Sequence, residues 1–146
     1  MTASAGIDPR GPRFTASVTL VLLAIALVVP NHTVSAVLVG IQGVFFAIGV
    51  LFGVHRTPTG TLFRTLIRPR LSPPTELEDP APPRFAQGVG LVFAVVGFLG
   101  YATGATLLGQ VAVGFAVVAA LLNAAFGYCL GCEMYLLGLR LTRRPA

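Results

Sequence analysis

Four runs of apolar residues, each close to the length of a membrane span, dominate this sequence. They extend over residues 14–30, 33–54, 85–103 and 106–125. A helix needs roughly 20 residues to cross the apolar part of a bilayer. The other residues cannot cover such surfaces in water, because only 10% of the chain is charged and 55% is hydrophobic. The sequence therefore predicts an all-α integral membrane protein, a bundle of four transmembrane helices.

The basic residues are distributed unevenly along the chain. All ten are arginines, and they occur before the first run, between the second and third runs, and after the fourth run as far as Arg144. The other two connections carry no charge. By the positive-inside rule, we expect a multi-pass protein of the inner (plasma) membrane with both termini and the long central loop in the cytoplasm. The net charge of +5 then reflects topology, and we expect no nucleic-acid partner.

An internal repeat is visible in the sequence. The segments DPRGPRFTASVTLVLL and DPAPPRFAQGVGLVFA share D-P-x-x-P-R-F and further apolar positions without a gap. We therefore expect a single membrane domain, 1–146, built from two related hairpins, 8–71 and 79–142, with a proline-rich acidic linker at 72–78. Because both hairpins begin on the same side, they are predicted to be parallel repeats. The repeat also favours retention of the first helix over its removal as a signal peptide.

Several arginines are expected to anchor the protein at the membrane surface. These residues are Arg13, Arg64, Arg68, Arg84 and Arg140. In TLFRTLIRPRL, after the second run, apolar residues form one face of a helix and arginines the other, which predicts a short interfacial helix. The matching segment of the second repeat, EMYLLGLRLTR, is more apolar. It can instead prolong the fourth helix inward.

Both cysteines of the chain lie in GYCLGCEMY, after the fourth run. Cys129 and Cys132 would share a helix face, with Glu133 in reach of it. At a helix start, unpaired amides stabilise a thiolate, so that a C-x-x-C becomes a reactive dithiol. We expect catalytic roles for Cys129 as nucleophile, Cys132 as resolving thiol and Glu133 as proton carrier. The pair would close a reversible disulfide or pass on a persulfide at the cytoplasmic membrane surface.

Two other interpretations of this motif stay open. It can be a packing seam, because cysteine is a small apolar residue that suits membrane helices. It can also hold zinc through Cys129, Cys132, His55 and Glu133, although the sequence has no second C-x-x-C or paired histidines. Zinc apart, we expect no cofactor.

Three stretches of this sequence resemble a known family. They are D-P-R-G-P-R-F near the N-terminus, R-P-R-L-x-P-P-x-E-L-E-D-P-x-P-P-R-F-A-Q-x-V-G from Arg68 to Gly90, and F-G-Y-C-L-G-C-E-M-Y. The chain resembles, over nearly its whole length, the small bacterial membrane proteins catalogued as domain of unknown function 4395. The resemblance implies a role in membrane-linked sulfur or thiol metabolism, beside a thioredoxin-like protein or a sulfurtransferase. It adds weight to Cys129 and Cys132.

Three functions follow as hypotheses. The first is a thiol-redox or sulfane-sulfur relay between the C-x-x-C and a cytoplasmic thioredoxin-like protein or sulfurtransferase. The second is a transport component for a small sulfur compound such as thiosulfate, which requires a homo-oligomer because four helices enclose a poor pathway. The third is a non-catalytic adaptor or scaffold whose arginine-rich surface holds a soluble partner at the lipid bilayer.

Overall fold

The computed structural model describes residues 6–143, so Arg144 lies outside the described residues. Within them the chain is all-α, with six α-helices and three shorter helical turns. Four helices are long and apolar enough to cross a membrane: α1 (Arg10–Val28), α2 (His32–Phe52), α4 (Ala81–Thr103) and α5 (Thr106–Phe126). This confirms an all-α chain with four long apolar helices, which suggest a lipid bilayer environment.

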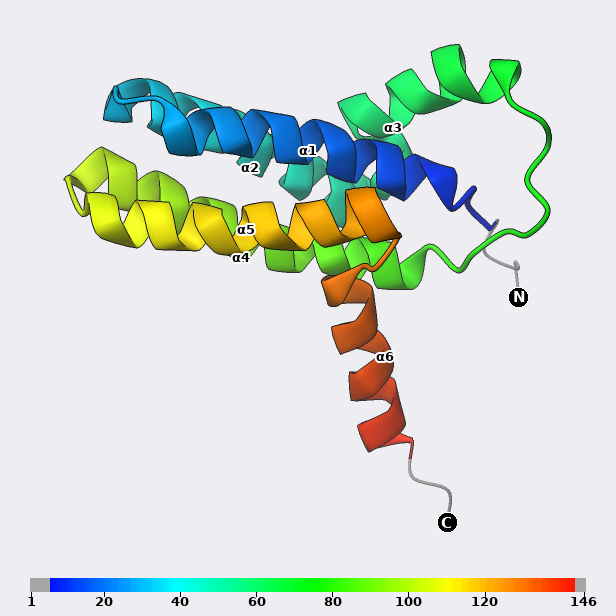
Figure 1. Ribbon diagram of the computed structural model, residues 1–146. Coiled ribbons are helices and arrows are strands. Elements are labelled where there is room, and N and C mark those ends of the chain that lie inside the picture. The colour runs from blue at the N-terminus through cyan, green and yellow to red at the C-terminus, as the bar shows by residue number, and fades with distance from the viewer. Residues whose placement is uncertain (1–5, 144–146) are drawn as a thin grey trace.

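The four long helices lie side by side (Figure 1). α1 packs along α2 and α5, and α4 packs along the same two helices. Leu23, Val39 and Val113 are fully buried where the helices meet. Outward-facing side chains are apolar as well, since Val28 and Leu107 expose 77% and 74% of their surface. Such side chains fit a solvent of lipid tails, because water would penalise them.

The residues after α2 form a series of short helical pieces. They are η1 (Val54–Arg56), α3 (Pro58–Leu62), η2 (Phe63–Ile67) and η3 (Arg68–Arg70). The Thr57 side chain caps α3, because its Oγ1 accepts from the Gly60 N–H at 3.0 Å and donates to the Val54 carbonyl at 2.7 Å. Thr59 lies 3.1 Å from the Thr15 hydroxyl of α1. A helical segment thus follows the second long helix, as expected, and its first turn is buried against α1.

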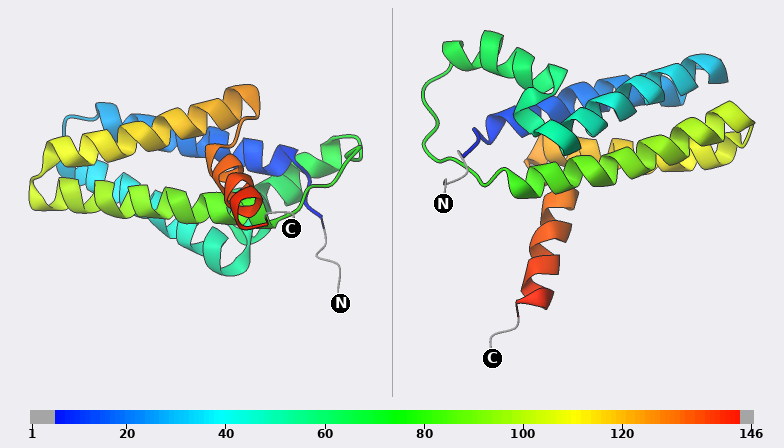
Figure 2. Two further views of the ribbon diagram at one scale, coloured as in Figure 1. Left: turned by 90° about the horizontal axis from the view of Figure 1, so that it is seen from below. Right: turned by 180° about the vertical axis from the view of Figure 1, so that it is seen from behind.

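The last helix, α6 (Leu130–Thr142), does not continue α5. It points away from the four long helices, across their length (Figures 1 and 2). The expectation that this segment can prolong the fourth helix is therefore wrong. The chain changes direction because the positive φ of Gly127 ends α5.

The linker between the halves is tied to the start of the chain. Ile7 and Glu78 exchange two backbone hydrogen bonds of 2.9 Å in an isolated antiparallel bridge. Arg10 donates to the Ser72 carbonyl at 2.9 Å and forms an ion pair with Asp8. The extended linker is thus held beside the beginning of α1, and no helix or strand forms within residues 72–78.

Candidate functional site

The segment that carries both cysteines begins where α5 stops. α5 ends at Phe126 because Gly127 adopts φ 67°, a left-handed conformation that glycine tolerates without steric cost. The Gly127 N–H donates to the Asn123 carbonyl at 2.9 Å, and the Tyr128 N–H donates to the Leu122 carbonyl at 3.2 Å. These bonds satisfy the last carbonyls of α5 and turn the chain toward α6.

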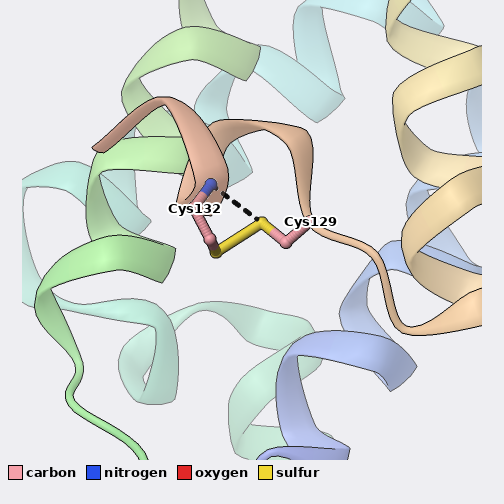
Figure 3. Close-up of a disulfide and its surroundings, with 2 residues drawn as sticks. All are labelled: Cys129 and Cys132. Atoms are coloured by element: carbon pink, nitrogen blue, oxygen red, sulfur yellow. Dashed lines mark hydrogen bonds between the residues drawn. A yellow bond between two sulfur atoms is a disulfide. The ribbon is translucent and has the colours of Figure 1, made fainter. Parts of the chain in front are cut away.

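Cys129 is the N-cap of α6. Its backbone is extended, and its Sγ accepts a hydrogen bond from the Cys132 N–H at 3.3 Å. A disulfide joins the two cysteines, whose Cα atoms are 5.1 Å apart (Figure 3). Both residues are half-buried. The sulfur of Cys129 therefore lies where unpaired amides and the helix dipole favour a thiolate once the bond is reduced.

Close packing on α4 fixes the start of α6. Gly131 is buried, and a Cβ at this position would overlap Ala86 of α4. One turn further on, the Tyr135 ring lies 5.7 Å from the Phe85 ring, centroid to centroid. A small residue next to the cysteines is thus required for α6 to dock. The C-x-x-C is held by a rigid contact with a long helix, although most of α6 is exposed.

Cys129 also borders a cavity of about 260 Å³. The cavity lies between the four long helices and the first turn of α6, where Met134 adds to its wall. The polar residues Gln87 and Asn123 are among its lining residues, and most of its surface is apolar. The disulfide can therefore be reached from inside the helix array as well as from its surface.

His55 does not border the cavity beside the cysteine pair, whereas Glu133 directly follows that pair in the chain. The Glu133 side chain is exposed and makes no ion pair within residues 6–143. His55 lines a different cavity, at the start of α1. No group of three or more His, Cys, Asp or Glu side chains in the described part of the chain could hold a metal ion. The four side chains considered for zinc are therefore not brought together.

The second cavity has a volume of about 220 Å³ and a charged lining. Its titratable residues are Asp8, His55, Arg64 and Arg68. The hydrogen bond from the Arg10 guanidinium lowers the pKa of Asp8 below its ordinary value. Desolvation of the ring and the positive charges of Arg64 and Arg56 lower the pKa of His55. This part of the surface favours negative over positive charge.

Two of the expected membrane anchors, Arg13 and Arg84, contact helix ends. Arg84 donates from Nε to the Val50 carbonyl at 2.6 Å and from Nη2 to the Leu51 carbonyl at 3.1 Å. Arg13 donates to the Ala124 carbonyl at 3.3 Å. A guanidinium at a helix C-terminus satisfies unpaired carbonyls and interacts favourably with the dipole. Sequence reasoning missed this role because each contact joins distant parts of the chain.

The remaining expected anchors, like Arg13 and Arg84, are exposed. These residues are Arg64, Arg68 and Arg140. Arg64 and Arg68 face the charged cavity, and Arg140 lies in the last turn of α6. Their contact with lipid headgroups stays a prediction.

Comparison with known proteins gives one match. The family described as "Domain of unknown function (DUF4395)" matches residues 7–140, which include both helix pairs and the C-x-x-C. No curated protein and no solved structure matches the chain.

Proposed function

We propose that this chain, which belongs to the domain of unknown function 4395 family, is a thiol-redox or sulfane-sulfur relay at the cytoplasmic face of the plasma membrane. The observation that carries the proposal is the Cys129–Cys132 disulfide at the first turn of α6. A C-x-x-C at a helix N-terminus is the usual environment of a reactive cysteine pair. Its partner would be a cytoplasmic thioredoxin-like protein or a sulfurtransferase.

The proposed orientation rests on the distribution of charge. Neither the connection between α1 and α2 nor that between α4 and α5 contains an arginine. Figure 1 shows these two connections at one end of the long helices, with α3 and the start of α6 at the other end. The positive-inside rule then favours a cytoplasmic location for the arginine-bearing end, the C-x-x-C and both termini.

The proposed parallel repeats, 8–71 and 79–142 around the linker 72–78, are supported by reciprocal contacts. Arg13 in the first half contacts the end of α5, and Arg84 at the matching position in the second half contacts the end of α2. In both halves an aromatic pair joins the first long helix to the segment after the second. Such an exchange is what a two-fold axis along the membrane normal would produce.

In the redox form of the proposal, the disulfide exchanges with a partner dithiol. A partner thiolate attacks one sulfur of the Cys129–Cys132 bond, and the other cysteine leaves as a thiolate that takes up a proton. The second partner thiol then breaks the mixed disulfide, so that the partner is oxidised and both cysteines are reduced. Two electrons and two protons are transferred. In the reverse direction Cys129 is the nucleophile and Cys132 resolves, with Glu133 as the proposed proton carrier.

In the sulfane-sulfur form, the Cys129 thiolate attacks the outer sulfur of thiosulfate. The sulfur–sulfur bond of thiosulfate breaks, sulfite leaves, and a persulfide forms on Cys129. The Cys132 thiol then attacks Sγ of Cys129, which releases hydrogen sulfide and closes the disulfide. A sulfurtransferase that removes the outer sulfur before this second step would receive it instead.

The test is mass-resolved thiol trapping in intact cells after fast acid quenching, with and without added thiosulfate. We expect disulfide or persulfide fractions on Cys129 and Cys132 that change with sulfur supply. Cys129→Ser is expected to abolish both species, because the nucleophile is lost. Cys132→Ser is expected to retain a persulfide or a mixed disulfide with the partner, because only the resolving step is lost. Membrane insertion of both variants is the control.

Two permanently free, unreactive thiols in the native protein would refute the relay. A partner that still copurifies after replacement of both cysteines would instead favour the adaptor function, with the arginine-rich surface as its binding site.

A further inference from the structure

The cavity beside the disulfide has a mostly apolar lining, without charged side chains among the described residues. It lies among the membrane-spanning segments. Phe46, Phe93 and Phe115 provide aromatic surface from three different helices. The rings of Phe93 and Phe115 lie 6.1 Å apart, centroid to centroid, in a tilted arrangement. A flat, apolar ligand would gain favourable contacts with these rings.

Two amides give this apolar cavity a small number of polar groups. Gln87 from α4 and Asn123 from α5 are among its lining residues, each with two N–H donors and one carbonyl acceptor, and the Gln87 carbonyl oxygen packs against Gly49 of α2. A few placed polar groups in a mostly apolar wall are typical of small-molecule sites. The amide N–H groups are suited to a neutral ligand with carbonyl oxygens.

The size of the cavity limits the ligand. An apolar cavity of about 150 Å³ holds a benzene molecule. The cavity beside Cys129, at about 260 Å³, therefore has room for one ring or two fused rings, with any long tail left outside. A thiosulfate ion is small enough to fit, but its two negative charges would have no cation beside them, at a high desolvation cost.

We propose that this cavity binds the ring of a lipid-soluble quinone, and that the quinone is the oxidant of Cys129 and Cys132. The inference rests on the proposed redox function, for which it names the second substrate. Bilayer quinones reach such a cavity from the membrane, their carbonyl oxygens match the amides of Gln87 and Asn123, and their rings match the phenylalanines. Cys129 borders the same space, so sulfur and quinone can meet.

The reaction is balanced without a further reactant. Cys129 and Cys132 as thiols lose two electrons and two protons, and a sulfur–sulfur bond forms between them. The quinone takes up the two electrons, and its two carbonyl oxygens take up the two protons, which gives the quinol. The cytoplasmic dithiol of the proposed relay then reduces the disulfide again. The net reaction transfers two electrons from a soluble thiol to the membrane quinone.

The test uses the full chain in detergent or nanodiscs, reduced, freed of reductant and kept without oxygen. Menadione, a two-ring quinone, is added in stoichiometric amount. Quinol formation is followed by ultraviolet absorbance, and the thiols of Cys129 and Cys132 are counted by alkylation and mass spectrometry. We expect one quinol formed for each disulfide formed. Menadione can also add covalently to thiols, so an intact protein mass is recorded, and duroquinone, whose ring carbons are fully substituted, is the matched probe.

A cavity-filling variant separates binding in the cavity from reaction at the surface. Ala119 of α5 lines the cavity, and Ala119→Leu would fill part of it. Ala125→Leu makes the same change at an exposed position of the same helix. We expect Ala119→Leu to slow duroquinone-driven disulfide formation about tenfold or more, the equivalent of roughly 1.4 kcal/mol. Ala125→Leu is expected to leave the rate unchanged, and both variants are expected to react normally with a soluble dithiol.

Each other outcome has a definite meaning. If the disulfide exchanges with a soluble dithiol but never oxidises with either quinone, the quinone site is wrong and the relay stands. Equal rates in Ala119→Leu and the native protein would also exclude the cavity as the quinone site. If the pair reacts with neither thiols nor quinones, the relay itself fails. Lipid tails found in the cavity by mass spectrometry, with no displacement by quinone, would identify it as an acyl-chain site.

Discussion

The segments that follow α2 and α5 are built alike and differ in one chemical respect. Each begins with a side chain that caps a short helix, Thr57 after α2 and Cys129 after α5. Each then has a buried glycine, Gly60 or Gly131, where the helix meets its neighbours. A hydroxyl caps one helix and a sulfur caps the other. In the proposed function, the sulfur carries the thiol chemistry that a threonine hydroxyl cannot perform.

The two segments also differ in exposure. Thr57 is fully buried and Thr59 nearly so, and hydroxyl contacts tie that segment to α1. α6 buries only Gly131, and the rest of its 13 residues are half-buried or exposed. The first segment therefore packs into the helix array, whereas the second leaves its cysteine pair half-buried at the edge of that array.

The most severe test exchanges the two caps. Cys129→Thr gives α6 the cap that α3 uses, so the helix should still begin at the same residue while the disulfide is lost. We expect thiol exchange to fall to background, with little change in helix content, measured by alkylation kinetics and circular dichroism. The reciprocal variant, Thr57→Cys, serves as the control and should gain no exchange, because the segment after α2 contains no second cysteine. Retained exchange in Cys129→Thr would show that the comparison is wrong.

A second test concerns the docking of α6. In Gly131→Ala the new methyl group overlaps Ala86, and we expect a loss of roughly 1–3 kcal/mol in the free energy that holds α6 on α4. Gly138→Ala is the matched control in the same helix, because a Cβ there meets no atom within 4 Å. Alanine favours a helix over glycine, so the control should be neutral or stabilising by about 0.5–1 kcal/mol. Protease sensitivity of α6 measures the difference, and equal sensitivity of both variants would contradict it.

A third test removes the cap of the first segment. Thr57→Ala leaves the Gly60 N–H without its acceptor, and we expect a cost of about 1–2 kcal/mol to the folded state. Thr65→Ala removes an exposed hydroxyl that contacts only the carbonyls of its own helical turn, and its effect should lie within about 0.5 kcal/mol. Denaturation of both variants in the same detergent provides the measurement. Equal midpoints would mean that the hydroxyl cap is dispensable.

The smallest expected effect is a pH dependence of stability in the segment that follows α2. The pKa of His55 is lowered below its ordinary 6.5 in the folded chain, so the unfolded chain binds its proton more readily. The contribution of His55 to stability is present above pH 6.5, and it is lost as the pH falls toward the lowered pKa of His55 in the folded chain. The pKa of Asp8 is lowered below 3.8, so its contribution is present above 3.8 and is lost only in stronger acid.

Hydrogen exchange of the segment after α2 at pH 7.5 and 5.5 measures the His55 effect. We expect faster opening at pH 5.5 in the native protein and a smaller pH difference in His55→Phe. Asp8→Asn is the control, because its carboxyl does not titrate in this interval. An unchanged pH difference in His55→Phe would assign the effect to another group.

The sequence predicted the four long helices because the length of an apolar run directly limits where a span can begin and end. It also predicted the pairing of Cys129 with Cys132, since three-residue spacing places both at one helix turn. It did not predict the contacts of Arg13 and Arg84 with distant helix ends, which depend on tertiary packing. The run 106–125 predicted the end of α5 to within a residue, but the sequence left open whether the later segment prolongs that helix, because an apolar segment after a glycine can also continue it.

The cap formed by Cys129 makes the oxidation state of the pair visible in the backbone. The Cys132 amide proton points at a sulfur that is bonded in one state and a thiol or thiolate in the other. Its nuclear magnetic resonance frequency and its exchange with deuterium are therefore expected to shift when the disulfide is reduced. A single labelled amide would then report the state of the site continuously, without any reagent that consumes the thiols.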